Sequence, residues 1–557
     1  MDVEVIIQEI GEFGRFQLQN YILVCLPVFY AAANSLTYVF TSRSTKYRCL
    51  VPECESANNT KYSKDWVKDI LPGSISDSSV FVPDECLKYK FIANTSDSSL
   101  ENETCQAHWF DHEKVRCYEW VFDGAETAIV NDWPDELACK ENKWKLALVG
   151  SVHYAGIIVG TALFGFLADH YGRKKMFIVS IILMSITGFG HGLASTYIWF
   201  LFYGFLNAIA TAGVYPLAFV LGVEMVGKNK REMAGVVLNY FYSIGEALVG
   251  IIAWIDGDWR NLQYWVSIPP ILFIFYYWII PESIRWLIAN EAYSKAFEIV
   301  KKASKENNRE LSGKLLEQFE EKCFKKENPE PNADDERHKS IELATYGKFL
   351  RSKILMIRSL CLCFIWGTNA FVFYGLSLNS INLSGNIFLN FVLGCLIEIP
   401  GNTISWITMN KFGRRRSLAA SLLICGICCI SGGFVDTNSA WIQMCLFLLG
   451  KMAITTSFTI IFVYTAEMMP TTVRGGCLGT FSTMSRFASL VAPFIPLLKS
   501  IYSFLPLVVF GLFAFISGFL SFLLPETLGS KLPDTIAEAE NIESRENISN
   551  TSDITRL

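Results

Sequence analysis

Four charged residues lie inside long apolar stretches of the sequence: Glu246, Glu398, Lys451 and Arg486. An ionised side chain at membrane depth costs several kcal/mol, so each is a functional candidate by default. The guanidinium of Arg486 can hold a carboxylate through two parallel hydrogen bonds. The acids Glu246 and Glu398 can attract a cationic group, a coupling ion or a proton. The structural alternative for each residue is an ion pair inside the protein, and we favour that alternative for Lys451, the candidate partner of Glu398.

Aromatic side chains among these charges can offer their ring faces to an ammonium group. We predict such a role for Tyr215, Trp366 and Tyr374, with Asn379 as an additional polar contact. The chain contains 42 Phe, 22 Tyr and 14 Trp, so simple packing is the alternative for every aromatic residue. Amides inside helices also commonly hold neighbouring helices together, which is the alternative for Asn379.

Membrane-spanning helices must position these residues. Apolar runs of about 20 residues recur along the chain, and this is the length needed to cross a bilayer core of roughly 30 Å. In lipid every backbone polar group must be satisfied within its own segment, which favours helices for runs of this length. The predicted spans are twelve, at about 21–40, 145–168, 176–194, 198–221, 233–255, 262–280, 354–378, 386–408, 417–434, 440–463, 475–498 and 503–524.

The composition excludes several classes of protein. Only 18% of the 557 residues are charged and 51% are hydrophobic, whereas an average soluble domain carries roughly 25% charge. A disordered chain, a small secreted disulfide-rich domain and an ordinary soluble enzyme are therefore excluded. The net charge of −5 argues against a nucleic-acid partner, and the six histidines show no metal-ligand spacing. No nucleotide-binding loop or nucleophile–base arrangement is visible, so we expect no enzyme activity, no metal and no cofactor, and leave Na⁺ coupling open.

Basic residues predict the orientation of the helices. The loops HYGRKK, VGKNKR and NKFGRRR hold most of the basic residues between spans, and basic loops remain in the cytoplasm. Twelve spans then place both termini in the cytoplasm of a multi-pass plasma-membrane protein. The predicted organisation is an N-terminal segment at 1–20, a six-helix half at 21–280, a cytoplasmic linker with amphipathic helices at 281–353, a second half at 354–524 and a tail at 525–557.

This orientation places a long loop, residues 41–144, outside the cell. Six of the sixteen cysteines lie in it, and an even number of cysteines in an oxidising compartment predicts three disulfides, with 15 pairings open. The same loop contains three acceptor motifs for N-glycosylation. The predicted disulfide cysteines are Cys49, Cys54, Cys86, Cys105, Cys117 and Cys139, and the predicted glycosylation sites are Asn58, Asn94 and Asn102.

Three short motifs occur twice, in the same order and at offsets of 241, 243 and 244 residues. Three coincidences at nearly constant offset indicate two similar six-helix halves with the same orientation, the parallel-repeat plan of a transporter. The paired copies are DHYGRKK at 169–175 and NKFGRRR at 410–416, EMV…R at 224–231 and EMM…R at 467–474, and PES at 281–283 and PET at 525–527.

The repeated motifs predict a cytoplasmic latch between the halves. Glycine permits a tight turn between closely packed helices, and acids near helix N-termini gain from the helix dipole. The candidate pairs across the halves are Asp169 or Glu224 with Arg474, and Glu467 with Arg231. The alternative is that the basic clusters only enforce topology. The latch candidates are Asp169, Gly172, Arg173, Glu224, Arg231, Gly413, Arg414, Glu467 and Arg474.

Motifs along nearly the whole chain resemble the organic cation, organic anion and carnitine transporter family of the major facilitator superfamily. They are EIGEFGRFQ, YRCLVPECE, GFLADHYGRKK, PESIRWL, FVYTAEMMPTTVRG and LPETLGSKLPDT. The resemblance implies an all-α membrane protein of twelve helices in two halves, with a large extracellular loop after the first helix. It also implies alternating access around a central cavity, and it is closest to carnitine-type and insect organic cation transporter-like members.

The resemblance leaves the substrate open. In this family the position of Arg486 is acidic in cation transporters and Arg in anion and carnitine-type members. Asn402 stands where anion-carrying relatives have Lys, which argues against a substrate that is purely anionic. We therefore expect a small organic cation or zwitterion of the carnitine, betaine or amine type as the partner. The alternatives are an organic anion exchanger and, more distantly, a non-transporting receptor that uses the external loop.

Overall fold

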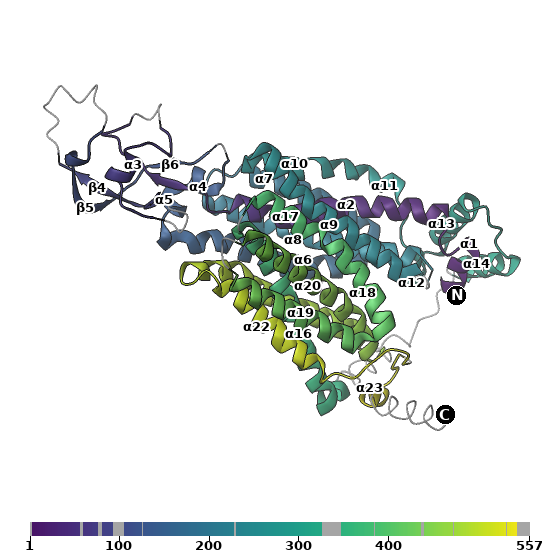
Figure 1. Ribbon diagram of the computed structural model, residues 1–557. Helices are drawn as coiled ribbons and strands as arrows, with labels where there is room; N and C mark the ends of the chain where they lie inside the picture. Colours follow the sequence, from purple (N-terminus) through teal and green to yellow (C-terminus); the bar gives the residue numbers. More distant parts are fainter. Residues whose placement is uncertain are drawn as a thin grey trace.

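A computed structural model describes most of the chain. The described residues are 3–55, 60–75, 81–92, 105–124, 126–227, 230–325, 347–383, 385–435, 439–471, 473–530 and 532–542. They form a long bundle of helices with a small strand-containing domain at one end (Figure 1).

The first half of the bundle contains six membrane-length segments. They are α2 (Arg15–Thr41), α6 (Lys143–Tyr171), α7 (Arg173–Gly192), α8 (Tyr197–Met225), α9 (Arg231–Asp256), and α10 (Trp259–Ser267) continued by η4 (Pro269–Phe275) and α11 (Tyr276–Ile279). The consecutive prolines at 269 and 270 lack backbone N–H groups, which explains why the sixth segment changes from α-helix to a tighter helix at this point.

The second half repeats this order. Its segments are α16 (Lys353–Asn379), α17 (Ile387–Leu396) followed by α18 (Glu398–Phe412), α19 (Arg414–Gly433), α20 (Ala440–Met468), α21 (Arg474–Val491) followed by η6 (Ala492–Ser500), and α22 (Leu505–Ser521). In the described residues, 11 segments are long and apolar enough to cross a membrane, and the 17-residue α22 is a shorter apolar helix. These segments coincide with the twelve predicted spans, and the all-α fold class is confirmed.

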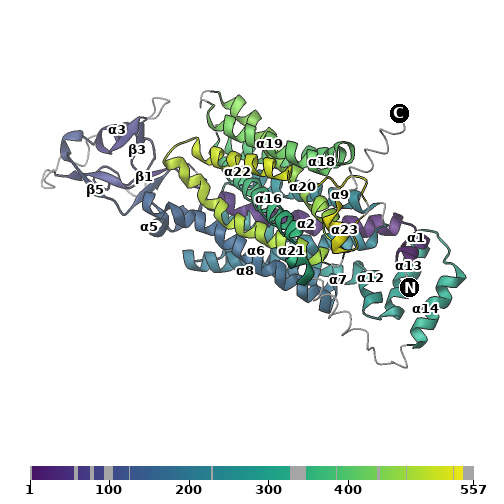
Figure 2. The same cartoon turned by 90° about the horizontal axis from the view of Figure 1, so that it is seen from below.

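The two halves contact each other mainly near the strand-containing domain, which we call the loop end of the bundle. There Ser151 of α6 donates a hydrogen bond of 2.7 Å to the carbonyl of Leu490 in α21, and the ring of Phe40 stacks on that of Phe388. The opposite end, where α1, α12–α14 and α23 lie, is called the motif end (Figure 2). Glycine Gly475, at the motif end of α21, faces open space.

The residues between α2 and α6 form a compact domain of three antiparallel strand pairs. The pairs are β1 (Tyr47–Cys49) with β6 (Trp120–Phe122), β2 (Gly73–Ile75) with β3 (Phe81–Pro83), and β4 (Leu87–Phe91) with β5 (Phe110–Arg116). The short helices are α3 (Val67–Ile70), η1 (Ala107–Trp109), α4 (Ile129–Asp132), α5 (Pro134–Leu137) and η2 (Lys140–Asn142). All six predicted cysteines are bonded, as Cys49–Cys117, Cys54–Cys105 and Cys86–Cys139. The three predicted glycosylation sites, Asn58, Asn94 and Asn102, lie outside the described residues.

Short amphipathic helices cover the motif end of the first half. They are α1 (Val3–Ile10), α12 (Ile284–Ala289), α13 (Tyr293–Glu306) and α14 (Gly313–Lys325), which share one apolar cluster. The side chain of Asn307 fastens this layer, because it accepts a hydrogen bond of 2.9 Å from the backbone N–H of Phe16 and donates one of 2.7 Å to the carbonyl of Ile10. In the second half, α23 (Ile536–Glu540) lies beside α16, where Arg358 donates to the carbonyl of Ala539 at 2.7 Å.

Candidate functional site

The three repeated motifs of the first half meet in one cluster. Gly172 adopts a φ of 108°, and a Cβ there would lie 2.6 Å from a carboxylate oxygen of Glu282, so a side chain does not fit. Glu282 accepts a hydrogen bond of 3.0 Å from the backbone N–H of Lys174, which places a carboxyl at the N-terminus of α7. Ser283 donates to Glu224, and Arg173 lies 3.8 Å from the same acid.

The second half reproduces this cluster with the corresponding residues. Gly413 has a φ of 92°, with Glu526 2.5 Å from the position of a Cβ. Glu526 accepts a hydrogen bond of 2.7 Å from the backbone N–H of Arg414, and Thr527 donates one of 2.6 Å to Glu467. The guanidinium of Arg414 pairs with Glu467 at 2.9 Å. The repeat in the sequence is therefore a repeat in local structure.

The ion pairs of these motifs stay within their own halves. Asp169 pairs with Arg173 at 3.0 Å, and Arg231 pairs with Glu4 of α1. Arg474 donates a hydrogen bond of 3.4 Å to the carbonyl of Met469. Among the described residues, no predicted pair across the halves is formed. Arg173 and Arg414, which directly follow the positive-φ glycines, lie against the acid of their own half. This conformation therefore lacks the predicted latch.

A buried ion pair joins two of the four charges that lie among apolar residues. Lys451 of α20 lies 2.9 Å from Glu398, and both residues are at most 2% exposed. The ammonium also donates hydrogen bonds of 2.7 Å to Ser377 and 3.2 Å to the carbonyl of Phe373. Across the interface of the halves, Ser243 of α9 donates to Glu398 at 3.0 Å. In this conformation Glu398 and Lys451 therefore form an ion pair inside the protein, which is the alternative to a direct role in substrate binding.

The third charge, Glu246, lies next to this pair without joining it. Its side chain is close to that of Glu398, and the residue is 0% exposed. Among the described residues no N–H or hydroxyl group donates to its carboxylate oxygens, and its hydrogen-bonding neighbour is the second acid, Glu398. Two acids therefore share the neighbourhood of a single ammonium, that of Lys451.

The fourth charge, Arg486, lies among tyrosines. Its guanidinium donates a hydrogen bond of 3.0 Å to the hydroxyl of Tyr374, and its Nε has no partner among the described residues. The ring of Tyr374 packs against that of Tyr154 with centroids 5.0 Å apart, and the hydroxyl of Tyr154 lies 2.9 Å from that of Tyr38. None of the ion pairs within the described residues includes Arg486, so an internal salt bridge does not account for it.

The remaining predicted binding residues divide between this cluster and the packed core. Tyr215 is partly exposed, donates a hydrogen bond of 2.6 Å to Asn239, and packs edge-on against Tyr242. Trp366 is 0% exposed and donates a hydrogen bond of 3.0 Å to Thr465 within the second half, so its position is that of a packing residue. Asn379 is the last residue of α16 and is buried near the loop end.

Three residues of the cluster were not among the sequence candidates: Tyr38, His153 and Tyr242. The ring of Tyr38 packs against that of His153 with centroids 5.3 Å apart. Tyr242 is within electrostatic reach of both Glu246 and Arg486, the two charges that lack an opposite partner. A signal for Tyr242 was present, because it precedes Glu246 by four residues and so lies on the same helix face.

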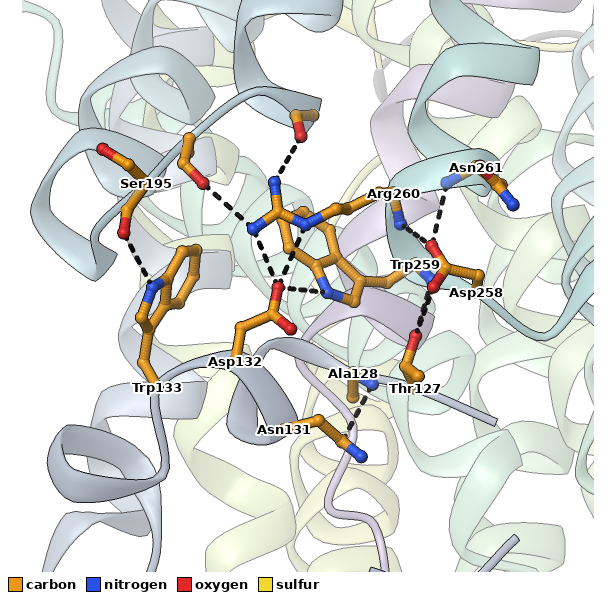
Figure 3. A network of polar contacts seen from close by, with 12 residues as sticks. Thr127, Ala128, Asn131, Asp132, Trp133, Ser195, Asp258, Trp259, Arg260 and Asn261 are labelled. Atoms are coloured by element: carbon orange, nitrogen blue, oxygen red, sulfur yellow. Dashed lines mark hydrogen bonds and ion pairs between the residues drawn. The ribbon is translucent and has the colours of Figure 1, made fainter. Parts of the chain in front are cut away.

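At the loop end, a polar network attaches the strand-containing domain to the first half (Figure 3). Asp132 accepts hydrogen bonds of 3.0 and 2.8 Å from Arg260 and one of 3.2 Å from the indole of Trp259. Arg260 also donates to the carbonyl of Gly192 at 2.8 Å, and Thr127 donates to Asp258 at 3.1 Å. The domain is thus tied to α10 and to the turn between α7 and α8.

Comparisons with known proteins agree with this architecture. The profile of the sugar (and other) transporter family matches residues 88–537. The chain is 33% identical to the organic cation transporter protein of Drosophila melanogaster, over 97% of this chain and 95% of that protein. It is 29% identical to solute carrier family 22 member 3 of Mus musculus, covering 97% and 95%, and 28% identical to organic anion transporter 3 of Pongo abelii, covering 97% and 94%.

Solved structures support the fold independently. The xylose transporter XylE from E. coli in an inward open conformation aligns with a TM-score of 0.56 at 17% identity, covering 75% of this chain and 93% of that one. Within the described residues, no group of three or more His, Cys, Asp or Glu side chains could hold a metal ion. The chain is a multi-pass transporter rather than an enzyme, and it belongs to the sugar (and other) transporter family, among the organic cation and organic anion transporters of the major facilitator superfamily.

Proposed function

We propose that the protein carries small organic cations or zwitterions of the carnitine, betaine or amine type across the plasma membrane by alternating access. The observation that carries the proposal is that Arg486 and Glu246, two buried charges near a group of tyrosines, each lack an oppositely charged partner of their own. Arg486 has no acidic partner and Glu246 has no cationic partner among the described residues, while Lys451 and Glu398 neutralise each other.

A zwitterion matches this arrangement of charge. Its carboxylate would bind the guanidinium of Arg486, which is already oriented by the hydroxyl of Tyr374. Its ammonium would lie against the rings of Tyr215, Tyr242 and Tyr374, whose faces attract cations. Glu246 would supply the negative charge on the cationic side.

Alternating access would proceed by rocking of the two halves around this midplane site. Contacts between the halves at the loop end, and motif ion pairs confined to each half, support a conformation closed at the loop end. We infer that the motif end faces the cytoplasm, since the basic loops lie there. The pairs of Arg474 with Asp169 or Glu224, and of Arg231 with Glu467, would form when that end closes.

The experiment compares uptake of labelled carnitine with that of a simple quaternary amine in cells that express the protein. Changing Arg486 to Asp should reduce carnitine uptake strongly and amine uptake little. Only carnitine has a carboxylate, and only carnitine would therefore lose its ion pair with Arg486. Arg309→Gln, on the exposed surface of the linker, is the matched control. Equal loss of both substrates would make Arg486 a structural residue and contradict the proposal.

The second candidate is exchange of organic anions, which the unpaired Arg486 favours. A dicarboxylate in the same panel tests it. If the protein takes up the dicarboxylate but neither carnitine nor the amine, its substrate is an organic anion and not a zwitterion.

A further inference from the structure

We propose that Glu246 is the protonation site through which this transporter exchanges a proton for the cationic group of its substrate. The inference rests on the proposed function and adds the coupling ion to it. It starts from the state of the Glu246 carboxyl before substrate binds, which the proposed function does not describe.

The surroundings of Glu246 in this conformation suit a neutral acid. The residue is 0% exposed, and among the described residues its carboxyl meets no donor and faces the carboxyl of Glu398. Burying an ionised carboxylate without a partner costs far more than binding a proton to it. Glu246 is therefore assigned as the protonated member of the two acids.

Charge balance gives the same assignment. Lys451 is the cation of the cluster, and its ammonium is already engaged by Glu398, Ser377 and the carbonyl of Phe373. In the group formed by Glu246, Glu398 and Lys451, one ammonium neutralises one carboxylate. Arg486 is not among the charges that act on Glu246, so a second ionised carboxylate would leave one negative charge uncompensated within this group. A single proton on Glu246 makes the cluster neutral.

The contacts of the two acids explain why Glu398 rather than Glu246 keeps its charge. Glu398 pairs with the ammonium of Lys451 and accepts a hydrogen bond from Ser243. Such contacts stabilise an ionised carboxylate. Glu246 lies in the middle of α9, and among the described residues no donor bonds to its carboxylate oxygens.

Two charged groups face Glu246: Glu398 from α18 and Lys451 from α20. The other titratable groups that face it are Tyr38 from α2, Tyr242 from α9 itself and Cys395 from α17. Phenol and thiol groups are neutral at physiological pH. The protonation of Glu246 is thus governed mainly by the Glu398–Lys451 pair and by any cation that enters among the tyrosines.

The position of Glu246 couples its proton to the motion of the halves. Helix α9 belongs to the first half and packs on α17 and α18 of the second, where Gly250 meets Phe391 and Tyr240 lies 2.7 Å from Thr403. Rocking of the halves changes these contacts. The balanced step is simple: Glu246 releases its proton to water as the substrate ammonium arrives, and takes a proton up after the ammonium leaves.

The experiment uses the purified full-length protein in liposomes, with carnitine as the probe. In the wild type, protons compete with the ammonium, so the half-saturating concentration of carnitine should rise as the pH falls. An acidic interior should drive accumulation of carnitine, and a dye inside the liposomes should report the departing protons. In Glu246→Gln, exchange of labelled for unlabelled carnitine should persist with a raised half-saturating concentration and no dependence on pH. Glu232→Gln, an exposed position on the same helix, should behave as the wild type.

The outcomes separate the two proposals. If the wild type exchanges carnitine but shows no proton flux, or if Glu246→Gln keeps the pH dependence of the wild type, the proton site is wrong while the proposed function stands. If a sodium gradient drives accumulation of carnitine at equal pH, and this accumulation is lost in Glu246→Gln, Glu246 is a sodium site and the proposal of a proton site is wrong. If the wild type exchanges neither carnitine nor any amine, the proposed function fails. Should the variant not fold, proton flux and pH competition in the wild type still decide.

Discussion

Glu398 and Lys451 form an ion pair of 2.9 Å in which neither residue is more than 2% exposed. The pair links α18 to α20, and the hydrogen bond from Ser243 extends it to the other half. It is the charged centre of the C-terminal half and sets the electrostatic environment of Glu246.

Changing Lys451 to Met should destabilise the protein and abolish transport. Removing one partner of a buried pair leaves an uncompensated charge, which costs about 3–5 kcal/mol. The double variant Lys451→Met with Glu398→Gln should recover most of the stability, because no unpaired ion remains. Thermal unfolding of the detergent-solubilised protein measures both, with Lys301→Met at an exposed site as the control. Equal stability of the single variant and the wild type would show that the pair is energetically unimportant.

Replacement of Gly413 by Ala should impair folding and transport. Its φ of 92° disfavours a side chain, and the added Cβ would lie 2.5 Å from Glu526. With a ψ of 166° the residue lies in a region that is essentially restricted to glycine, so the conformational cost alone is roughly 1–3 kcal/mol. Displacement of Glu526 would also free the N-terminus of α19. A lower unfolding temperature and reduced surface expression are expected.

The matched control for that change is Gly475→Ala. A Cβ at Gly475 meets no atom within 4 Å, and its helical position favours Ala over Gly. The control should be at least as stable as the wild type. If the two alanine variants are equally stable, the turn does not require glycine at position 413.

The fold was predictable from the sequence because each of its signals is local. Apolar length sets a span, and the recurrence of Gly172 and Gly413 in similar surroundings reveals the two halves. The broken segments follow equally local rules, as with the prolines at 269 and 270.

The site was predictable only in part, because its contacts join residues far apart in sequence. The sequence identified Arg486 and Glu246 as charges at depth and offered Lys451 as the partner of Glu398, but it did not reveal that Glu246 lies beside this pair without a cationic partner of its own. Pairing depends on how helices rotate against each other, which composition does not encode. Trp366 illustrates the same point, since its helix presents it to Thr465 rather than to the tyrosine cluster.

Changing Arg260 to Ala should weaken the attachment of the strand-containing domain to the helical bundle. Arg260 donates to Asp132 and to the carbonyls of Gly192 and Ala194, so its loss removes four hydrogen bonds at once. Hydrogen exchange in residues 126–138 should accelerate, while exchange in α16–α22 stays unchanged. Arg116→Ala, on an exposed strand of the same domain, should leave both regions unaffected. Unchanged exchange in Arg260→Ala would place the attachment elsewhere, for example at the disulfide between Cys86 and Cys139.

The stability of the strand-containing domain should fall in acid because of a second buried ion pair. Arg48 and Glu55 have completely buried side chains and form an ion pair of 2.7 Å. Burial alone would raise the pKa of Glu55, but the hydrogen bonds and charge of Arg48 outweigh it and hold the pKa below its ordinary value. A lowered pKa in the folded state means that this stabilisation is present above the ordinary pKa of Glu and is lost as the pH falls below it.

Changing Glu55 to Gln should therefore weaken the domain at neutral pH and remove most of its sensitivity to acid. The neutral amide leaves Arg48 buried without an anion, at a cost of about 3 kcal/mol. The rate of protease cleavage within residues 60–75 of the full-length protein measures the opening of the domain. Wild-type cleavage should accelerate as the pH falls below the ordinary range of a Glu carboxyl, whereas cleavage of the variant should be fast throughout. A variant that keeps the wild-type dependence on pH would assign the acid sensitivity to another group, since Glu55 would then no longer be available to titrate.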